Sequence, residues 1–532
     1  MVAKKRFRPY DPQARVELPG DLRQYLPRDH QVFLIEDLVE SLDLRPITRV
    51  YEQGDGRGQP PYHPVLLTKL LLHAYCEGET SARVIMRKTY EDIGYRVLCV
   101  DQHPDFRTIS DFRERHLPAF LAVFKDTVRL AKELGQVRLE HVAQDGSKIL
   151  ANASKHKAMS YERMGQTEAR LGQEIAALLE SARATDAAED TRYGRDGSGD
   201  EVPVALQAEV DFRQARRARI RAAQAALEAR AAAQAAAPAP ADPDQRQPPH
   251  LLAPEPPAAG DPPSSEPPHL TLVPEAPGPA ADPASPPPAV VPPPTAQYNF
   301  TDPASRIMPS KDGFVQAYNG QVGVDSYRQI IVACDVTDDC TDPRQLQPLL
   351  DQVRQNTGGL PDAYSADSGY WSEDNLAALE RRGVDAYIPP PRPPRRKEGT
   401  STATPLTPSK ARMQAKLATP AGKRTYSLRK ETAEPVFGQL KDGRGLRRFR
   451  TRGLAKVRGE WALWCLTHNL RKLARVVRDP RIAVRAARAG PVVARSPLRR
   501  WAPSLRFLEL TTARSRPAAT FAHPLLLIQT GS

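Results

Sequence analysis

The sequence predicts an α/β fold: a mixed sheet flanked by helices, preceded by an all-helical N-terminal domain and interrupted by a helical plus Pro-rich insertion. Three observations predict it. Apolar residues recur at helical spacing between residues 29 and 135. Beyond residue 136, short apolar runs typical of strands alternate with helical patterns. Between the first of these runs and the rest, 22 of the 53 prolines fall within residues 238–294, a composition that cannot form a packed core.

The N-terminal region, residues 1–135, is expected to be a helical domain. Pro64 suits the first turn of a helix, and Ser81 and Ser110 suit the caps of two others. Because no recognition helix stands out, two interpretations carry equal weight, a scaffold and a DNA-binding bundle. DNA binding is kept as the functional expectation for this domain.

The sheet is expected to begin in residues 136–159, where the apolar period changes. Asp145-Gly146-Ser147 lies between two apolar runs and is interpreted as a tight turn joining two strands. Further strands are expected at 314–324, 329–336, 363–366 and 386–388, and helices at 343–356, 372–382 and 460–477.

The insertion divides this layer. Residues 160–236 are expected to form two antiparallel helices, and residues 237–297 a Pro-rich disordered linker. The layer resumes over 298–478, in which a Pro-, Lys- and Arg-rich stretch at 389–424 follows the last strand. Residues 479–532 are basic with little periodicity, and we expect a disordered tail or the product of a shifted reading frame rather than a domain.

Charge and composition indicate a polyanionic partner. Lys and Arg total 76 against 63 Asp and Glu, a net charge of +13. Nucleic acid is the first candidate. A membrane surface is a weak second candidate, because the most apolar stretch, residues 64–76, is too short to span a bilayer. Five cysteines without a CxxC pair indicate neither a disulfide framework nor a zinc site, which fits a reducing cytoplasm.

Three carboxylates stand at positions suited to metal-dependent phosphodiester chemistry. Such enzymes hold two hard cations with oxygen ligands from several elements. Asp145 and Asp367 follow apolar strand-like runs, and Glu434 precedes Pro435. Taken alone, each has a structural explanation: a hairpin turn for Asp145, a loop before a helix for Asp367, and favourable charge at a helix N-terminus for Glu434.

Several ordered blocks spanning most of residues 20–475 resemble a known family. They are HPDFRTISDFRERH (103–116), AQDGSKILANAS (143–154), AYNGQVGVDSYRQIIVACDVT (317–337), YSADSGYWSEDNL (364–376), YSLR (426–429), EPVFGQLK (434–441), GLRRFRTRG (445–453) and LTHNLRKL (466–473). In this order they resemble the bacterial insertion-sequence transposases of the DDE class, which have a helical N-terminal domain before a ribonuclease H-like catalytic domain.

The resemblance implies a site and a reaction. It matches the family's metal-holding and catalytic triad to Asp145, Asp367 and Glu434, and its basic position after the Glu to Lys441. In a ribonuclease H-like fold the first Asp lies on the central strand, the second at the end of a neighbouring strand, and the Glu on a helix packed against the sheet. Two Mg²⁺ or Mn²⁺ ions would activate water to cleave the ends of the element. The freed 3′-hydroxyl ends would then attack target DNA.

The sequence departs from the family pattern in two respects. The commonest family spacing would put the Glu at Ala433, which leaves Glu431 as a competitor of Glu434. Glu434 is favoured because Pro435 is expected to begin a helix there. The separation of Asp145 from Asp367 is also long, 367 − 145 = 222 positions, most of which the insertion accounts for.

Basic residues near the triad are expected to contact DNA. Arg429 and Lys441 flank Glu434, and Lys441 follows it by two helical turns, within reach of a phosphate. Four more arginines, Arg447, Arg448, Arg450 and Arg452, either grip the phosphate backbone or belong to a solvated loop. Tyr370 and Tyr426 are not assigned as nucleophiles, and His468 and Asn469 are expected to pack or orient neighbouring groups.

The expected function is therefore a DNA transposase that is a homodimer or larger assembly on DNA, is located in the bacterial cytoplasm at the nucleoid, and has no membrane partner. Two alternatives remain. One is a metal-dependent DNA nuclease without strand transfer. The other is an inactive DNA-binding relic of a transposon, which the intact triad disfavours and the irregular tail after residue 479 favours.

Overall fold

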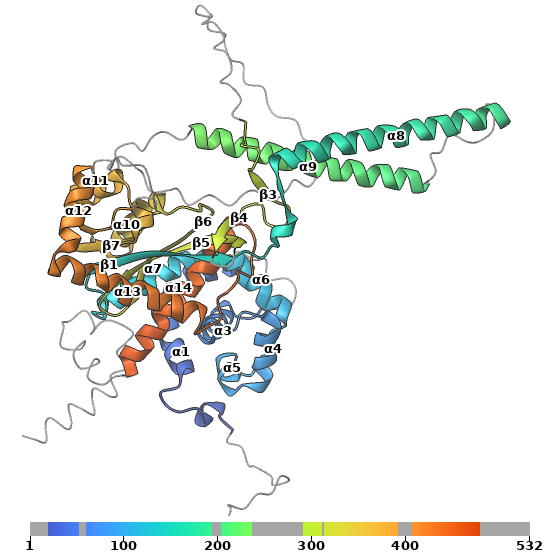
Figure 1. Cartoon of the computed structure of the whole chain (residues 1–532). Helices are drawn as coiled ribbons and strands as arrows, with labels where there is room; N and C mark the ends of the chain where they lie inside the picture. The colour runs from blue at the N-terminus through green and yellow to red at the C-terminus, as the bar shows by residue number, and fades with distance from the viewer. Residues whose placement is uncertain are drawn as a thin grey trace, which may run out of the picture. The chain divides into compact units, whose positions relative to one another are not determined.

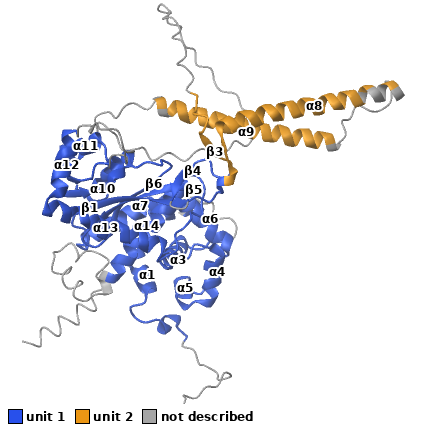
Figure 2. Cartoon of the chain, in the orientation of Figure 1, with its two compact units in different colours: residues 1–155, 301–532 blue, residues 156–300 orange. Residues whose placement is uncertain are grey.

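The computed structural model describes residues 20–52, 60–193, 204–236, 291–310, 313–391 and 407–478. The chain divides into two compact units, one of residues 1–155 and 301–532 and the other of residues 156–300 (Figure 2). The tail beyond residue 478 and residues 237–290 of the expected linker lie outside the described residues.

The N-terminal part of the first unit is helical throughout. Its elements are η1 (Leu22–Tyr25), α1 (Gln31–Ser41), α2 (Arg45–Glu52), α3 (Pro64–Glu77), α4 (Ala82–Glu91), α5 (Ile93–Leu98), α6 (Phe106–His116) and α7 (Ala119–Glu133). Pro64 begins α3, and the Ser81 side chain caps α4, both as predicted. Ser110 is not a cap, because it lies within α6, whose N-cap is Asp105.

A mixed sheet forms the middle of the first unit. It contains β1 (His141–Leu150), β4 (Arg306–Ser310), β5 (Gly313–Asp325), β6 (Ile330–Thr337), β7 (Ala363–Ser365) and β8 (Asp385–Tyr387). The order is β4-β5-β1-β7-β8, with β6 also paired to β5. Strand β5 is antiparallel to β1 and β6, whereas β7 and β8 run parallel to β1. This arrangement confirms the expected ribonuclease H-like α/β class.

The predicted turn at Asp145-Gly146-Ser147 is wrong, since these residues lie inside the single strand β1. Nine consecutive residues of β1, from Val142 to Leu150, pair with β5. This long ladder outweighs the local turn preference of Asp-Gly. Glycine suits this position for another reason: a Cβ at Gly146 would lie 2.4 Å from Nε2 of Gln321 and 2.9 Å from the Tyr370 hydroxyl, so these buried side chains would have to shift.

Helices cover the sheet and join it to the N-terminal helices. They are α10 (Leu346–Thr357), α11 (Glu373–Arg381), α12 (Pro408–Ala418), α13 (Pro420–Lys441) and α14 (Leu454–Arg478), with short turns η4 (Pro343–Gln345) and η5 (Ser368–Tyr370). Helix α13 packs on β1, and α14 packs on β6, α3 and α7 (Figure 1). One continuous core includes Leu71 of α3, Val322 of β5 and Trp461 of α14.

Pro435 does not begin a helix, contrary to the prediction. It lies inside α13, which begins at Pro420 behind the cap Thr419. A proline cannot donate to the carbonyl four residues earlier, here that of Glu431. The Gln329 side chain supplies the missing donor, with Nε2 2.8 Å from the Glu431 carbonyl oxygen, so the helix continues through Pro435.

The second unit contains the helical insertion. Helices α8 (Tyr161–Tyr193) and α9 (Val204–Ala236) are antiparallel, since Glu168 pairs with Arg217 and Glu174 with Arg213. Their contact buries an apolar cluster of Met164, Leu171, Ile220, Ala223 and Leu227. Two short strands, β2 (Ala158–Ser160) and β3 (Gln297–Asn299), pair at the base of the unit.

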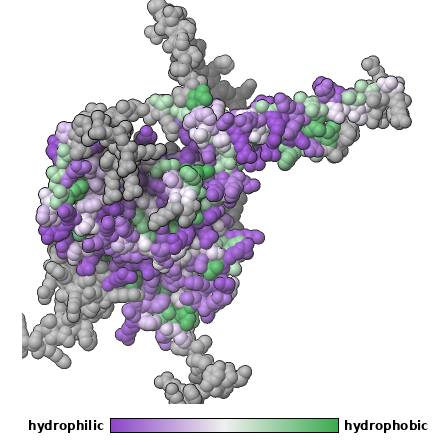
Figure 3. Space-filling model, in the orientation of Figure 1, coloured by the Kyte–Doolittle hydropathy of each residue, from purple (hydrophilic) through white to green (hydrophobic). Residues whose placement is uncertain are grey.

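Polar and charged side chains dominate the face of the molecule seen in Figure 3. Among the described residues, no helix is both long and apolar enough to cross a membrane.

Candidate active site

The strand register brings Asp145 and Asp367 together. Ala143 of β1 pairs with Ser365 of the parallel strand β7. Two residues further along each chain stand Asp145 and Asp367, and the backbone of Asp367 is still extended. Side chains two residues apart share a face of a sheet. The carboxylates of Asp145 and Asp367 therefore lie on the same face of the sheet and at the same height along the two neighbouring chain segments.

Arg429 of α13 joins this pair to Glu434. Its guanidinium lies 3.8 Å from Oδ1 of Asp145 and 3.4 Å from Oε1 of Glu434. The Arg429 side chain is 11% exposed and that of Asp145 15%, whereas Glu434 is 51% exposed. Thus the carboxylates of Asp145 on β1 and Glu434 on α13 both contact the buried guanidinium of Arg429, and Asp367 lies beside Asp145.

The electrostatics of Asp145 reflect this crowding. Burial raises the pKa of Asp145 to about 6; Arg429 opposes that rise, and the Asp367 and Glu434 carboxylates add to it. Arg429 has a raised pKa, because its own burial is outweighed by Asp145 and other neighbouring acidic groups. A carboxylate that is costly to ionise is one that an added cation would stabilise.

The side chains of Asp145, Asp367 and Glu434 fit a hard cation by chemistry, since all three offer carboxylate oxygens. Within the described residues, however, no group of three or more acidic, His or Cys side chains lies close enough to hold one ion. In this arrangement the Arg429 guanidinium contacts both Asp145 and Glu434.

A fourth carboxylate, Asp342, lies beside Asp367 and was missed by the sequence reasoning. A Cβ added at Gly369 would lie 2.9 Å from Oδ1 of Asp367 and 3.3 Å from Oδ2 of Asp342. The Asp342 carboxylate accepts hydrogen bonds from Asn319 at 2.7 Å and Gln321 at 2.9 Å. In the sequence, Asp342 precedes Pro343 and looks like an ordinary helix cap, so only the fold identifies it.

Tyr370 packs beneath the aspartates. Its side chain is fully buried, and its hydroxyl donates to the Gln321 side chain. Burial raises its pKa well above the usual value, further raised by Asp342, Asp145 and Asp367. The buried ring and the hydrogen-bonded hydroxyl fit a packing role for Tyr370.

Two other glutamates downstream of Asp367, Glu431 and Glu460, lie in different surroundings. Glu460 is completely buried and accepts from the backbone amides of Arg450 and Thr451 at 2.9–3.0 Å. It therefore holds the 450–451 backbone. Glu431 is exposed on α13, and its carbonyl is the one that Gln329 binds.

Apart from Arg429, the expected DNA-contacting residues fall into two groups. Lys441 points to β1, where its ammonium donates to the Ser147 hydroxyl and, at 3.0 Å, to the Lys148 carbonyl; burial lowers its pKa. The second group is exposed and lies between α13 and α14, at Arg447, Arg448, Arg450 and Arg452.

His468 and Asn469 orient the β5–β6 connection, as expected. The Asn469 side chain accepts from the Ile331 amide at 2.9 Å and donates to its carbonyl at 2.8 Å. The His468 ring contacts the Gln329 carbonyl at 2.9 Å, and burial lowers its pKa to about 3, so the ring is neutral.

Comparison with known families gives two matches. A transposase DDE domain family matches residues 392–474, the segment that contains Arg429, Glu434 and Lys441. A transposase domain family, DUF772, matches residues 20–115, the N-terminal helices up to α6. No curated protein and no solved structure matches the chain.

Proposed function

Because the chain is a DDE-type insertion-sequence transposase, as its two family matches support, we propose that it cleaves the ends of its insertion sequence and joins the 3′-hydroxyl ends to target DNA. The observation that most supports this is the parallel register that makes Asp145 and Asp367 level, with Glu434 held beside them through Arg429. The proposed catalytic and metal-holding residues are these three carboxylates.

Two Mg²⁺ or Mn²⁺ ions, when bound by Asp145, Asp367 and Glu434, would supply Lewis-acid activation of water and of the DNA phosphate. Arg429 neutralises the acidic cluster before loading, and its release from Asp145 and Glu434 frees a cation to contact a DNA phosphate. Lys441 fixes α13 to β1 next to Asp145 through Ser147 and Lys148. It thereby sets the distance of Glu434 from the two aspartates.

DNA is the proposed partner of the rest of the first unit. The N-terminal helices and the basic residues Lys441, Arg429, Arg447, Arg448, Arg450 and Arg452 are the proposed contacts. The protein would act as a homodimer or larger assembly on its two DNA ends, in the bacterial cytoplasm at the nucleoid. A nuclease without strand transfer is the second candidate, since the same carboxylates also serve simple hydrolysis.

The test uses single substitutions and a labelled DNA that contains one end of the element. Asp145→Ala, Asp367→Ala and Glu434→Ala should each abolish Mg²⁺-dependent cleavage and retain DNA binding. Glu431→Ala is the matched control on α13, three residues before Glu434, and should cleave normally. Cleavage by Asp145→Ala at the wild-type rate would refute the mechanism. Cleavage without joined products, when target DNA is supplied to the wild-type protein, would favour the nuclease.

A further inference from the structure

We propose that a basic pocket between the N-terminal helices and the 447–453 loop binds the phosphate backbone of the DNA duplex next to the cleavage site. This arginine pocket has a volume of about 430 Å³ and includes Arg83, Phe106, Arg107, Arg113, Arg450 and Asp111 in its lining. The inference rests on the proposed function for the identity of the partner, and it assigns a defined contact surface to the N-terminal helices.

The charges of the pocket favour a polyanion. Four of its lining residues are arginines, and its one acidic lining residue, Asp111, is exposed. Within the described part of the chain, none of the four arginines forms a salt bridge with a carboxylate. A protein surface that leaves several guanidinium groups without acidic partners is suited to phosphate oxygens, which accept paired hydrogen bonds from such groups.

The pocket also holds its arginines in position. The Arg83 guanidinium stacks on Phe106, 4.0 Å from the ring centroid, and that of Arg107 lies 5.6 Å from the same centroid. Arg113 is buried and donates to the Thr80 carbonyl at 2.6 Å, while Arg450 donates to the Thr80 hydroxyl at 3.0 Å. Stacking and these bonds limit side-chain freedom before DNA arrives, which lowers the entropic cost of binding.

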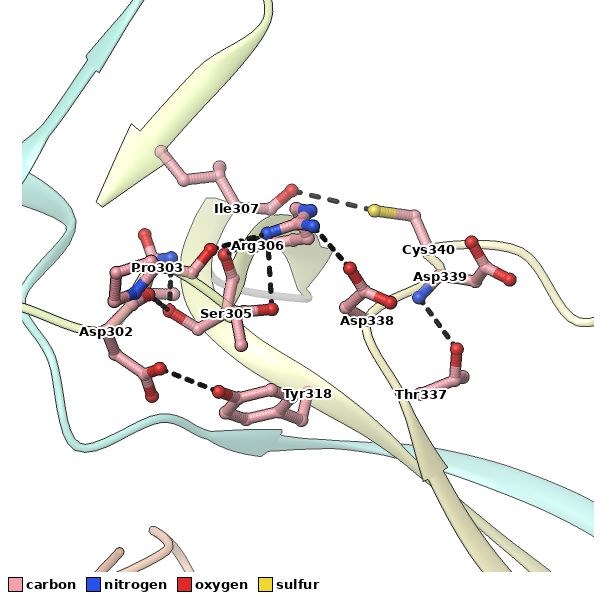
Figure 4. A network of polar contacts seen from close by, with 12 residues as sticks. Asp302, Pro303, Ser305, Arg306, Ile307, Tyr318, Thr337, Asp338, Asp339 and Cys340 are labelled. Atoms are coloured by element: carbon pink, nitrogen blue, oxygen red, sulfur yellow. Dashed lines mark hydrogen bonds and ion pairs between the residues drawn. The ribbon is translucent and has the colours of Figure 1, made fainter. Parts of the chain in front are cut away.

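The loop that contains Arg450 is fixed at several points. The Glu460 carboxylate binds the Arg450 and Thr451 amides, and the Asn152 side chain donates to the Arg450 carbonyl at 2.7 Å. At the end of the loop, the Gly453 amide donates to Asp302 at 3.1 Å. Asp302 also accepts from the Tyr318 hydroxyl at 2.8 Å, within the polar network of Figure 4.

The same loop connects the pocket to the catalytic strand. Leu150, the last residue of β1, donates to the Arg447 carbonyl at 3.2 Å and accepts from the Phe449 amide at 2.9 Å. From Asp145 to Leu150 the strand advances by roughly 17 Å, at about 3.3 Å per residue. That length corresponds to about five base pairs of duplex. A duplex with its reactive phosphate at Asp145 can therefore extend along β1 to the pocket.

The experiment compares Arg83→Gln/Arg107→Gln with the wild-type protein. Both side chains are exposed, so the double variant should fold, and its thermal unfolding is checked. Arg87→Gln is the matched control, because Arg87 lies on α4 one turn after Arg83, is 63% exposed and pairs with Glu91. Binding is measured by fluorescence anisotropy without metal, using an end-containing duplex with long or short flanking DNA, over a range of salt concentrations.

The double variant should bind the long duplex more weakly, and the slope of log affinity against log salt should be shallower by about 2, one for each lost phosphate contact. Arg87→Gln should keep the wild-type slope, and Arg83→Lys/Arg107→Lys should largely restore it. An unchanged slope and affinity in the folded double variant would overturn the inference. Because no metal is used, a wild-type protein that fails to cleave but shows this pattern would refute the proposed chemistry and leave the pocket supported.

Discussion

Replacing Asp145 by Asn should stabilise the metal-free protein at neutral pH. Asp145 has a folded-state pKa raised from 3.8 to about 6, mainly by burial. The raised pKa means that the folded state binds the Asp145 proton more tightly than the unfolded state. Ionising Asp145 therefore costs folding free energy, and this cost is absent below pH 3.8, where the carboxyl is protonated in both states. The cost grows as the pH rises and is complete above about 6. That pKa difference corresponds to about 3 kcal/mol at neutral pH.

The free energy of unfolding is measured by urea denaturation in EDTA, at about pH 4 and about pH 7.5. Asp145→Asn should exceed the wild-type protein by up to about 3 kcal/mol at the higher pH and by far less at the lower. Glu431→Gln, at an exposed position, should match the wild-type protein at both. Mg²⁺ should stabilise the wild-type protein more than Asp145→Asn. An Asn variant that is less stable than the wild-type protein at pH 7.5 in EDTA would refute the reasoning.

Three further outcomes are expected. Gly146→Ala should lower the free energy of unfolding by about 1–3 kcal/mol in urea denaturation, because its Cβ would clash with Gln321, whereas Gly438→Ala, where a Cβ meets nothing within 4 Å, should be neutral or stabilising. Gln329→Ala should cost about 0.5–1.5 kcal/mol by removing the hydrogen bond to the Glu431 carbonyl, and adding Pro435→Ala should recover part of that loss. DNA affinity should fall steeply with salt in binding titrations; a flat dependence would contradict the electrostatic contribution of the arginines.

The sequence predicted the elements whose apolar period is long. Strands β5 and β6 match the expected segments within one residue at each end, and helix α14 contains the expected helix 460–477 but begins at Leu454, because each has an extended run of buried residues. Ser110 misled as a helix cap, because Asp105 caps α6 instead. Two further local signals that misled were Asp145-Gly146 and Pro435. Each is overruled by a partner remote in sequence, β5 for the first and Gln329 for the second. A turn preference of about 1 kcal/mol cannot compete with a nine-residue ladder. A replaced hydrogen bond offsets part of the cost of a proline inside a helix.

The candidate site was predictable only in part, because contacts between residues remote in sequence determine much of it. Asp145, Asp367 and Glu434 could be proposed because they stand in recognisable blocks. The position of Arg429 between two carboxylates, and that of Asp342 beside Asp367, depend on tertiary packing of α13 and of the β6–α10 connection. Nothing in the spacing of these residues encodes that proximity.

Strands β2 and β3 form a paired stem at the two ends of the insertion, so the geometry of the sheet in the first unit does not depend on the length of the insertion. Strands β2 and β3 make Ala158 and Asn299 neighbours, and the Phe300 amide bonds to the Lys157 carbonyl at 3.1 Å. The chain thus leaves and returns at nearly the same point, whatever lies between. Such a junction lets sequence be gained, lost or exchanged in this interval while β1 and β7 keep their register. The interval that this stem closes, rather than the stem itself, is accordingly the place to insert a foreign domain or a fluorescent reporter.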